Sequence, residues 1–264
     1  MASFLYRISK TVIQVILLEV VFGACEKSDH YYSLLPESRM QDWLHSVNSL
    51  DKMNAFRYHY KGFELDVHFN SDSSCFFVKH DVEEPDTLPL WKWMKHLEQP
   101  DNFGLWFDFK NLDSSNLIPS LQEFLYLREA FHLRGLIIIE SMNFSFLSLF
   151  DTLNFKASYY IPTFDPQTLT PEEEFYYVDL ITKAVEVSKV STISAYTMQH
   201  DFMMKHFRNM NKLLWYLDST DPEIKRKIIK ETAEDPTVEI LLVRESGPII
   251  SFSVPPSGHA QCLQ

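Results

Sequence analysis

The sequence predicts an α/β protein built as a single (β/α)8 barrel, and three observations support this fold class. Apolar, β-rich runs alternate with helical patterns along most of the chain. Eight such strand runs occupy roughly 225 residues, which fits an eight-stranded barrel in count and in length. The alternative is a doubly wound open sheet, which favours a Gly-rich first turn, and the sequence contains neither GxGxxG nor a P-loop.

Eight apolar runs rich in β-favouring residues are predicted as the barrel strands. A short extended piece, Phe76–Val78, is expected after the second of them. In chain order the strands are Gln41–Ser46, Gly62–Phe69, Phe103–Lys110, Gly135–Glu140, Lys156–Ile161, Ser191–Thr197, Lys212–Asp218 and Val238–Arg244.

Helical patterns fill the intervals between these strands. Two of the helices begin with a capping residue before a proline, Thr170 before Pro171 and Asp221 before Pro222. The predicted helices are Ser49–His59, Leu88–Leu97, Ser115–His132, Phe144–Leu153, Pro171–Val187, His200–Asn209 and Pro222–Ala233.

The composition excludes several classes of protein. Of the 264 residues 45% are hydrophobic and 14% aromatic, which is enough for a packed core. Lys and Arg number 24 against 36 Asp and Glu, giving a formal net charge of −12 with no compensating basic run. Nucleic acid is therefore not an expected partner, since binding its backbone needs a positive surface. The three cysteines include no CxxC pair and can form at most one disulfide.

The N-terminal segment is predicted to be an export signal. Arg7 and Lys10 are followed by the largely apolar stretch 11–24, which is short for a membrane span. Gly23-Ala24-Cys25 resembles the lipobox of bacterial lipoproteins, in which the cysteine becomes the lipidated first residue. A lipid anchor at Cys25 would place the protein in the cell envelope, in the periplasm or on the outer surface. The alternative is the first amphipathic helix of a cytoplasmic protein.

Three segments follow from this interpretation. They are a lipoprotein-type signal peptide, 1–24, a polar tether, 25–39, and the barrel domain, 40–264.

The second predicted strand carries ionisable residues on one face. Glu64, Asp66 and His68 alternate with an apolar set, so in a barrel the ionisable set would face inward. Burying three such groups costs several kcal/mol unless a metal or other partners satisfy them.

The next strand repeats this pattern. Trp106, Asp108 and Lys110 share one face, opposite an apolar set. Because adjacent strands bring such side chains together, Glu64, Asp66 and Asp108 are predicted to bind one hard divalent cation, Mg²⁺ or Ca²⁺. Lys110, beside them, is suited to an anionic ligand.

Two histidines are expected at the rim of the barrel. His45 ends the first strand and His80 follows the second on its C-terminal side, where the active sites of such barrels lie. Their place above the carboxylates suits paired general acid–base catalysis.

These residues carry a resemblance to a known superfamily. Their order resembles the motif order of the PLC-like phosphodiesterases, which include glycerophosphodiester phosphodiesterases and the spider-venom sphingomyelinase D enzymes. The resemblance covers most of the chain after Met40, and its specific motifs lie in the first half. The matching motifs are His45, Glu64-x-Asp66, His80-Asp81 and Asp108-x-Lys110, and the stretches similar to the menorin branch are Gly62–His68, Leu105–Asn111 and Ile137–Ser141.

The resemblance implies a role for each matching residue. Glu64, Asp66 and Asp108 match the metal carboxylates, and Lys110 matches a phosphate-facing lysine. His45 and His80 match the catalytic pair. No long insertion separates the second and third strands, so a TIM barrel of the PLC-like phosphodiesterase type without a large cap insertion is expected.

One position departs from the superfamily pattern. Glycerophosphodiester phosphodiesterases follow the first histidine with Arg and Gly, where this chain has Ser46 and Val47. Asn48 is a candidate to replace the missing substrate contact. Further candidate substrate contacts are Glu140 and Tyr159, with Ser141, Tyr160, Gln199, His200, Asp201 and Trp215 as weaker ones.

Two functions remain open from the sequence. The first is a metal-dependent phosphoric diester hydrolase acting on a glycerophosphodiester or a (lyso)phospholipid-like substrate, so that the partner is a small phosphodiester or a lipid headgroup. The second is a catalytically weak or inactive barrel lipoprotein that binds a ligand or partner at the cell envelope. Ser46 is the feature that favours the second.

Overall fold

The computed structural model describes residues 40–216 and 222–244. The predicted signal and tether, including Cys25, lie outside these residues, and so does Cys262. Cys75 is a free thiol.

Within the described residues, eight parallel strands close into a barrel, which confirms the predicted fold class. The sheet runs β1–β9–β8–β7–β6–β5–β4–β2, and pairing of β1 with β2 completes the ring. The strands are β1 (Gln41–Leu44), β2 (Gly62–Asn70), β4 (Gly104–Phe109), β5 (Ile137–Ser141), β6 (Lys156–Tyr160), β7 (Thr192–Tyr196), β8 (Asn211–Trp215) and β9 (Val238–Val243).

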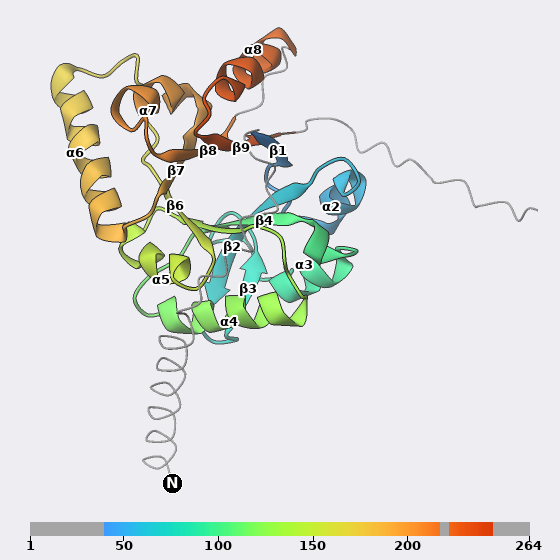
Figure 1. Ribbon diagram of the computed structural model, residues 1–264. Coiled ribbons are helices and arrows are strands. Elements are labelled where there is room, and N and C mark those ends of the chain that lie inside the picture. The colour runs from blue at the N-terminus through green and yellow to red at the C-terminus, as the bar shows by residue number, and fades with distance from the viewer. Residues whose placement is uncertain (1–39, 217–221, 245–264) are drawn as a thin grey trace, which may run out of the picture. The chain divides into compact units, whose positions relative to one another are not determined.

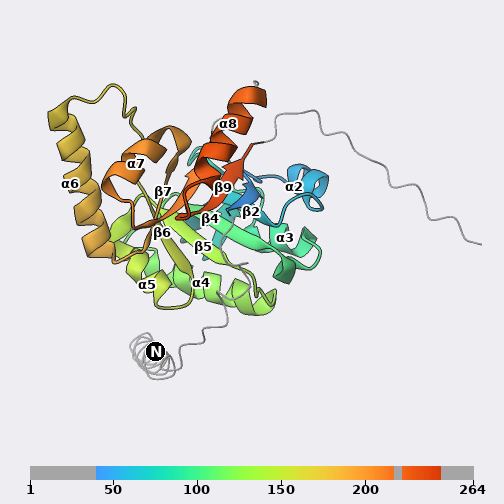
Figure 2. The same cartoon turned by 45° about the horizontal axis from the view of Figure 1, so that its top comes forward.

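Helices surround this barrel, as Figures 1 and 2 show from two directions. The helix α6 has a clear start signal, a complete capping box between Thr170 and Glu173. The stretch predicted as one helix over 144–153 is divided into a 3₁₀ turn, Phe144–Phe146, and a short α-helix. The helices are α2 (Leu50–Phe56), α3 (Leu90–His96), α4 (Leu117–Ala130), α5 (Leu147–Asp151), α6 (Pro171–Ser188), α7 (His200–His206) and α8 (Pro222–Ala233).

A hairpin extends one side of the barrel. Its return strand, β3 (Cys75–Val78), pairs antiparallel with the second half of β2, with Val78 opposite Val67. Among the described residues, only β3, α3 and a 3₁₀ turn lie between β2 and β4. The expectation of a barrel without a large cap insertion is therefore confirmed.

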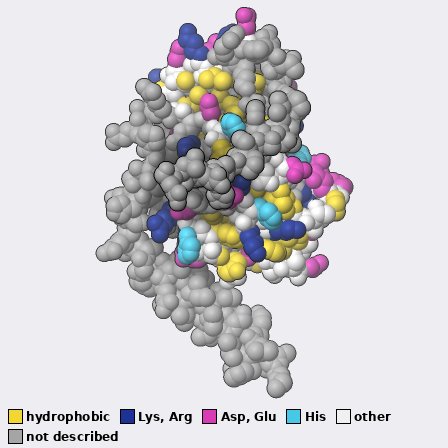
Figure 3. Space-filling model, turned by 90° about the vertical axis from the view of Figure 1, so that its right-hand side faces the viewer, with side chains coloured by type: hydrophobic (Ala, Val, Ile, Leu, Met, Phe, Trp, Pro, Cys, Tyr) yellow, Lys and Arg dark blue, Asp and Glu magenta, His cyan; other side chains and the backbone are white. Residues whose placement is uncertain are grey.

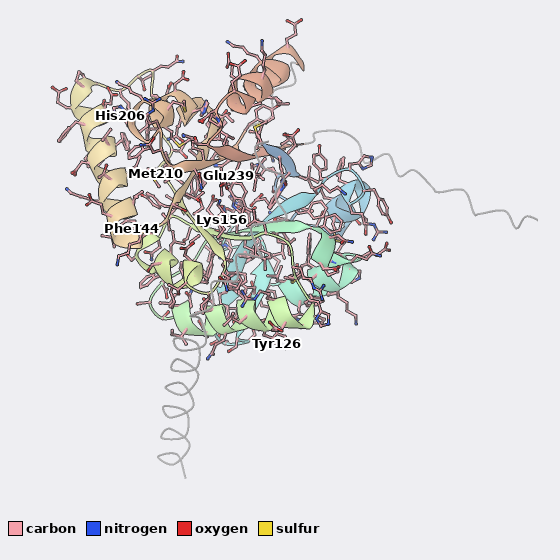
Figure 4. The ribbon with its side chains drawn as sticks, viewed as in Figure 1. Tyr126, Phe144, Lys156, His206, Met210 and Glu239 are labelled. Atoms are coloured by element: carbon pink, nitrogen blue, oxygen red, sulfur yellow. The ribbon has the colours of Figure 1, made fainter. Side chains whose placement is uncertain are left out.

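Strand alternation divides the apolar residues into two cores. Phe63, Leu65 and Val67 pack outward, in the large cluster between the barrel and its helices. A smaller cluster fills the barrel itself, and its buried members are Trp43, Trp106, Ile138, Leu213, Ile240 and Leu242. At the N-terminal end of the barrel, Lys156 on β6 forms an ion pair with Glu239 on β9, and both residues are labelled in Figure 4. Since these two strands are not neighbours in the sheet, the ion pair ties together separate parts of the ring.

Trp43 closes the barrel interior where β1, β2 and β4 meet, and it requires glycine on both neighbouring strands. A Cβ atom at Gly62 would lie 2.1 Å from a Trp43 ring atom, and one at Gly104 would lie 2.2 Å from another. Any larger residue at either position would overlap the indole.

The described surface carries both signs of charge. On the face shown in Figure 3, acidic side chains are interspersed with Lys, Arg and His, and no continuous basic patch is visible among the described residues. None of the helices in these two ranges is both long and apolar enough to cross a membrane.

Candidate active site

A cavity of about 250 Å³ opens at the C-terminal ends of the barrel strands. This is the end at which enzymes of this fold place their active sites. Its lining comes from six of the eight barrel strands and from the segments that follow β1, β3, β4 and β9: His45, Ser46, Glu64, Asp66, His80, Asp108, Lys110, Glu140, Tyr160, Trp215, Leu242 and Arg244.

Three carboxylates converge in this cavity as the strand pattern predicted. Asp66 on β2 is the register partner of Asp108 on β4, and Glu64 lies one inward position below Asp66. One oxygen from each of the three side chains lies within 4.8 Å of the others, and all three residues are buried.

Each of these carboxylates has a neighbour that fixes its orientation. The Ser46 amide donates to Glu64 Oε2 at 2.5 Å. Lys110 Nζ lies 2.7 Å from Asp66 Oδ1 and 2.5 Å from Asp108 Oδ2, so its charge is shared between the two aspartates. Lys110 is therefore placed beside the carboxylates, as predicted.

Asn48 has a different partner from the one expected. Its Nδ2 donates to Asp66 Oδ2 at 2.5 Å, and its Oδ1 accepts from the Asp66 amide at 3.0 Å. Both polar atoms of the side chain thus bind Asp66, and Asn48 does not line the cavity. In this structure Asn48 positions a carboxylate, whereas the sequence suggested a contact to substrate.

The pKa values of the charged side chains in this group are strongly shifted. Burial, together with the charges of Asp66 and Asp108, raises the pKa of Glu64 well above its ordinary value. Burial also raises the pKa of Asp108, to about 6, although Lys110 opposes this shift. Burial alone would lower the pKa of Lys110, but the Asp108 and Asp66 carboxylates outweigh it and the pKa is raised. Negative charge is thus crowded here beyond what Lys110 neutralises.

The two predicted histidines both line the cavity, in unlike surroundings. His45 Nε2 lies 3.6 Å from Glu64 Oε2, and 19% of the His45 side chain is exposed. Burial lowers the pKa of His45 to about 4. His80 is 60% exposed, and its Nδ1 lies 2.7 Å from Asp81 Oδ1. The chain reaches His80 through the β2–β3 hairpin, and His68 Nε2 lies 3.0 Å from the His80 carbonyl oxygen.

On β6, the structure corrects one predicted substrate contact. Tyr159 faces outward and packs against Phe144, with ring centroids 5.5 Å apart, so it does not reach the cavity. Its neighbour Tyr160 lines the cavity and lies edge-on to Trp215, at 5.9 Å between centroids. The reason is the two-residue period of a strand, which sends adjacent side chains to opposite faces.

Glu140 lines the cavity as predicted, and it is buried. Its Oε2 has no hydrogen-bond partner among the described residues. Burial and the neighbouring Asp108 charge raise the pKa of Glu140 well above its ordinary value.

The weaker candidates mostly have structural partners. Ser141 Oγ donates to the Phe109 carbonyl, and Gln199 Nε2 donates to the Pro162 carbonyl. His200 Nε2 lies 3.0 Å from Asp235 Oδ2, in a separate hollow that Asp201 also lines. Of this group, only Tyr160 and Trp215 line the cavity.

The sequence reasoning missed Arg244 as a site residue. Arg244 follows β9 directly and lines the cavity two strands away from Asp66, since β1 alone separates β9 from β2 in the ring. Its place at the C-terminal end of a predicted barrel strand was a signal that could have identified it.

The carboxylate group fits a hard divalent cation. All three ligands are oxygens, which Mg²⁺ and Ca²⁺ prefer. Their burial and mutual repulsion make the metal-free arrangement costly, and a cation at this place would remove that cost. The adjacent Lys110 and the histidines add groups able to bind an anion and to transfer protons.

Comparisons with known proteins agree on the fold. No family model and no curated protein matches the sequence. A glycerophosphodiester phosphodiesterase from Parabacteroides distasonis is similar in structure, with 16% identity, 78% of this chain and 93% of that one covered, and a TM-score of 0.53. A phosphodiesterase from Oleispira antarctica, solved with sn-glycerol-3-phosphate, has 13% identity, coverage of 81% and 94%, and a TM-score of 0.54.

A domain of a Pyrococcus furiosus chitinase is also similar, with 8% identity, coverage of 78% and 85%, and a TM-score of 0.52. At such identities structural likeness shows the fold, and one fold supports several activities. The chain therefore has a TIM barrel, and its structural neighbours include the glycerophosphodiester phosphodiesterases that the motif order predicted.

Proposed function

We propose that this protein is a divalent-metal-dependent phosphoric diester hydrolase, acting on a glycerophosphodiester or a (lyso)phospholipid-like substrate. One observation carries the proposal. The buried group of Glu64, Asp66 and Asp108 lies beside Lys110, in a cavity that His45 and His80 also line. The likeness to phosphodiesterase structures supports the same class of reaction.

The side chains have separate tasks in this reaction. Glu64, Asp66 and Asp108 would hold Mg²⁺ or Ca²⁺, and the cation would neutralise the charge that develops on the phosphoryl oxygens. Lys110, fixed between two aspartates, would add positive charge beside the phosphate. Glu140, Tyr160 and Trp215 form the wall available to the alcohol portion of the substrate.

The two histidines would move the protons. One histidine accepts a proton from the nucleophile, which is water or a hydroxyl of the substrate itself, as the new P–O bond forms. The other donates a proton to the leaving alkoxide as the old P–O bond breaks. Each positioned acid or base typically contributes about 10²–10⁴-fold to the rate.

Hydrolysis of a chromogenic phosphodiester, measured with and without EDTA, tests the proposal. Activity should disappear with EDTA and return with Mg²⁺ or Ca²⁺. Asp66→Asn should weaken cation binding in calorimetry, because an amide is a poorer ligand for a hard cation. Asp72→Asn, on the exposed turn of the β2–β3 hairpin, is the matched control. Unchanged cation affinity in Asp66→Asn would contradict the shared site.

A second candidate function is a non-catalytic barrel that binds a ligand around a structural ion. The observation that favours it is Ser46, which stands where glycerophosphodiester phosphodiesterases carry arginine. Tight retention of a cation without turnover of any phosphodiester would support this alternative.

A location in the cell envelope belongs to the same proposal, and it rests on the sequence Gly23-Ala24-Cys25. If the export signal is used, the mature protein begins with a lipidated Cys25. Mass spectrometry of the N-terminus, after expression in a bacterium with the lipoprotein pathway, should find the lipid. A soluble product that retains Met1 would contradict it.

A further inference from the structure

The charges that line the cavity are unevenly partnered. Four carboxylates face two cationic side chains, Lys110 and Arg244. The Lys110 ammonium is in contact with both Asp66 and Asp108. Arg244 is exposed, and no carboxylate among the described residues forms an ion pair with it. Within the described part of the chain, Arg244 is therefore the cationic lining residue whose charge is not shared with a carboxylate.

The backbone places Arg244 next to the catalytic candidates. Val243 on β9 is the register partner of Leu44 on β1, and the His45 amide donates to the Val243 carbonyl at 2.9 Å. Arg244 therefore lies beside His45, on the side of His45 away from β2. Around the rim the order is Arg244, then His45, then the three carboxylates.

This order leaves a space for a phosphate group between Arg244 and the carboxylates. A phosphate at the carboxylate-bound cation would have His45 above it and Arg244 on its far side. A guanidinium can donate two parallel hydrogen bonds to two phosphate oxygens, and it keeps its charge at all relevant pH values. Ser46, in contrast, offers its amide to Glu64 and its Oγ to Asn48, so position 46 supplies no cation to this space.

We propose that Arg244 is a second anion-binding residue of the cavity, in addition to Lys110, contacting non-bridging phosphate oxygens from the β9 side. The proposal rests on the proposed function for the location of the phosphate. It assigns to the last barrel strand the contact that an arginine after the first strand would otherwise make. The barrel permits this exchange because β9 and β2 are the two neighbours of β1 in the closed ring.

Binding of inorganic phosphate, measured by calorimetry in the presence of Mg²⁺, tests the assignment without relying on turnover. Arg244→Ala should weaken phosphate binding about tenfold to a hundredfold, the effect expected for losing hydrogen bonds to a charged group. Arg244→Lys should give an intermediate affinity, because it keeps the charge but loses the two-pronged contact. Arg208→Ala, which changes an exposed arginine in the turn before β8, should leave phosphate binding unchanged. Mg²⁺ affinity should be the same in all four proteins.

The kinetic counterpart separates this inference from the proposed function. With a phosphodiester substrate, Arg244→Ala should raise KM or lower kcat/KM by a similar factor. Equal phosphate affinity in wild type and Arg244→Ala, or no phosphate binding by the wild-type protein, would overturn the inference. Arg244-dependent phosphate binding without hydrolysis would uphold the inference and overturn the proposed function. Hydrolysis with the same KM and kcat in the wild type and in Arg244→Ala would uphold the proposed function and overturn the inference.

Discussion

At the scale of single residues, the two histidines differ in what surrounds them. His45 is largely enclosed near Glu64 and Trp215, whereas His80 stands on an exposed loop beside Asp81. We expect His45→Ala and His80→Ala each to lower kcat about 10²–10⁴-fold. Because both serve one reaction, the double variant should lose less than the product of the two single effects.

Steady-state kinetics with metal content measured on each variant checks this prediction. Cation binding should survive both changes, because neither histidine belongs to the carboxylate group. His96→Ala, on the exposed side of α3, is the control and should keep full activity. A variant of His45 or His80 with near-wild-type turnover would show that the residue in question is structural.

At the scale of elements, the β2–β3 hairpin and the loop after it determine where His80 lies. Lys79, 8% exposed, binds this loop through the carbonyls of Val82 and Glu84 and through Asp86 Oδ1 at 2.8 Å. Lys79→Met should therefore release the loop and lower kcat while leaving cation affinity unchanged. It should also reduce the free energy of unfolding by about 1–3 kcal/mol, the cost of unpaired polar groups.

Activity, calorimetry and urea denaturation of the same preparation distinguish these effects. Lys79→Arg keeps the charge and should recover part of the activity. If Lys79→Met lost cation binding together with activity, the loop would be supporting the carboxylates and not His80 alone.

The strands and the carboxylate group could be predicted because they depend on local rules. The two-residue period of β2 and β4 puts Glu64, Asp66 and Asp108 on the inner face whatever the rest of the chain does. The same rule, applied to β6, puts the more polar set that includes Tyr160 on the inner face and Ala157 and Tyr159 on the outer one. Tyr159 could therefore have been excluded from the cavity by the reasoning used for β2.

Contacts between distant segments could not be read from the sequence. Asn48 binds Asp66 across 18 residues because the loop after β1 bends over β2, with Ser46 at a φ of 54°. Arg244 reaches the cavity because β9 closes the ring against β1. Both follow from barrel closure, which brings the first and last strands together, and no local pattern records it.

At the scale of the whole molecule, the crowded carboxylates couple stability to pH and to metal. Burial raises the pKa of Asp108 in the folded protein to about 6. A group whose pKa rises on folding favours the folded state fully below its ordinary pKa, and this contribution is lost as the pH rises through the folded value. In EDTA, Asp108→Asn should therefore gain stability relative to wild type between about pH 4 and pH 7, by on the order of 2 kcal/mol.

His45 contributes a pH dependence of stability with the opposite sign, and it does so in both proteins. It therefore cancels in the difference between the free energies of unfolding of the variant and the wild type. Thermal or urea unfolding at several pH values measures this difference, with Asp72→Asn as the control. In saturating Mg²⁺ the order should reverse, because only the wild type gains the free energy of cation binding. A pH-independent difference in EDTA would show that Asp108 keeps an ordinary pKa.

The packing of Trp43 against two glycines has a consequence for how this protein can diverge. Gly104→Ala alone should overpack the interior and destabilise the fold by about 1–3 kcal/mol, whereas a smaller aromatic such as Phe at position 43 should relieve much of that cost. Positions 43, 62 and 104 are thus expected to change together among descendants of this sequence. Trp43 lies two residues before His45 and Gly62 two residues before Glu64. A change in the packing of Trp43 and the two glycines would also shift His45 and Glu64. Selection on catalysis would therefore act on this packing as well.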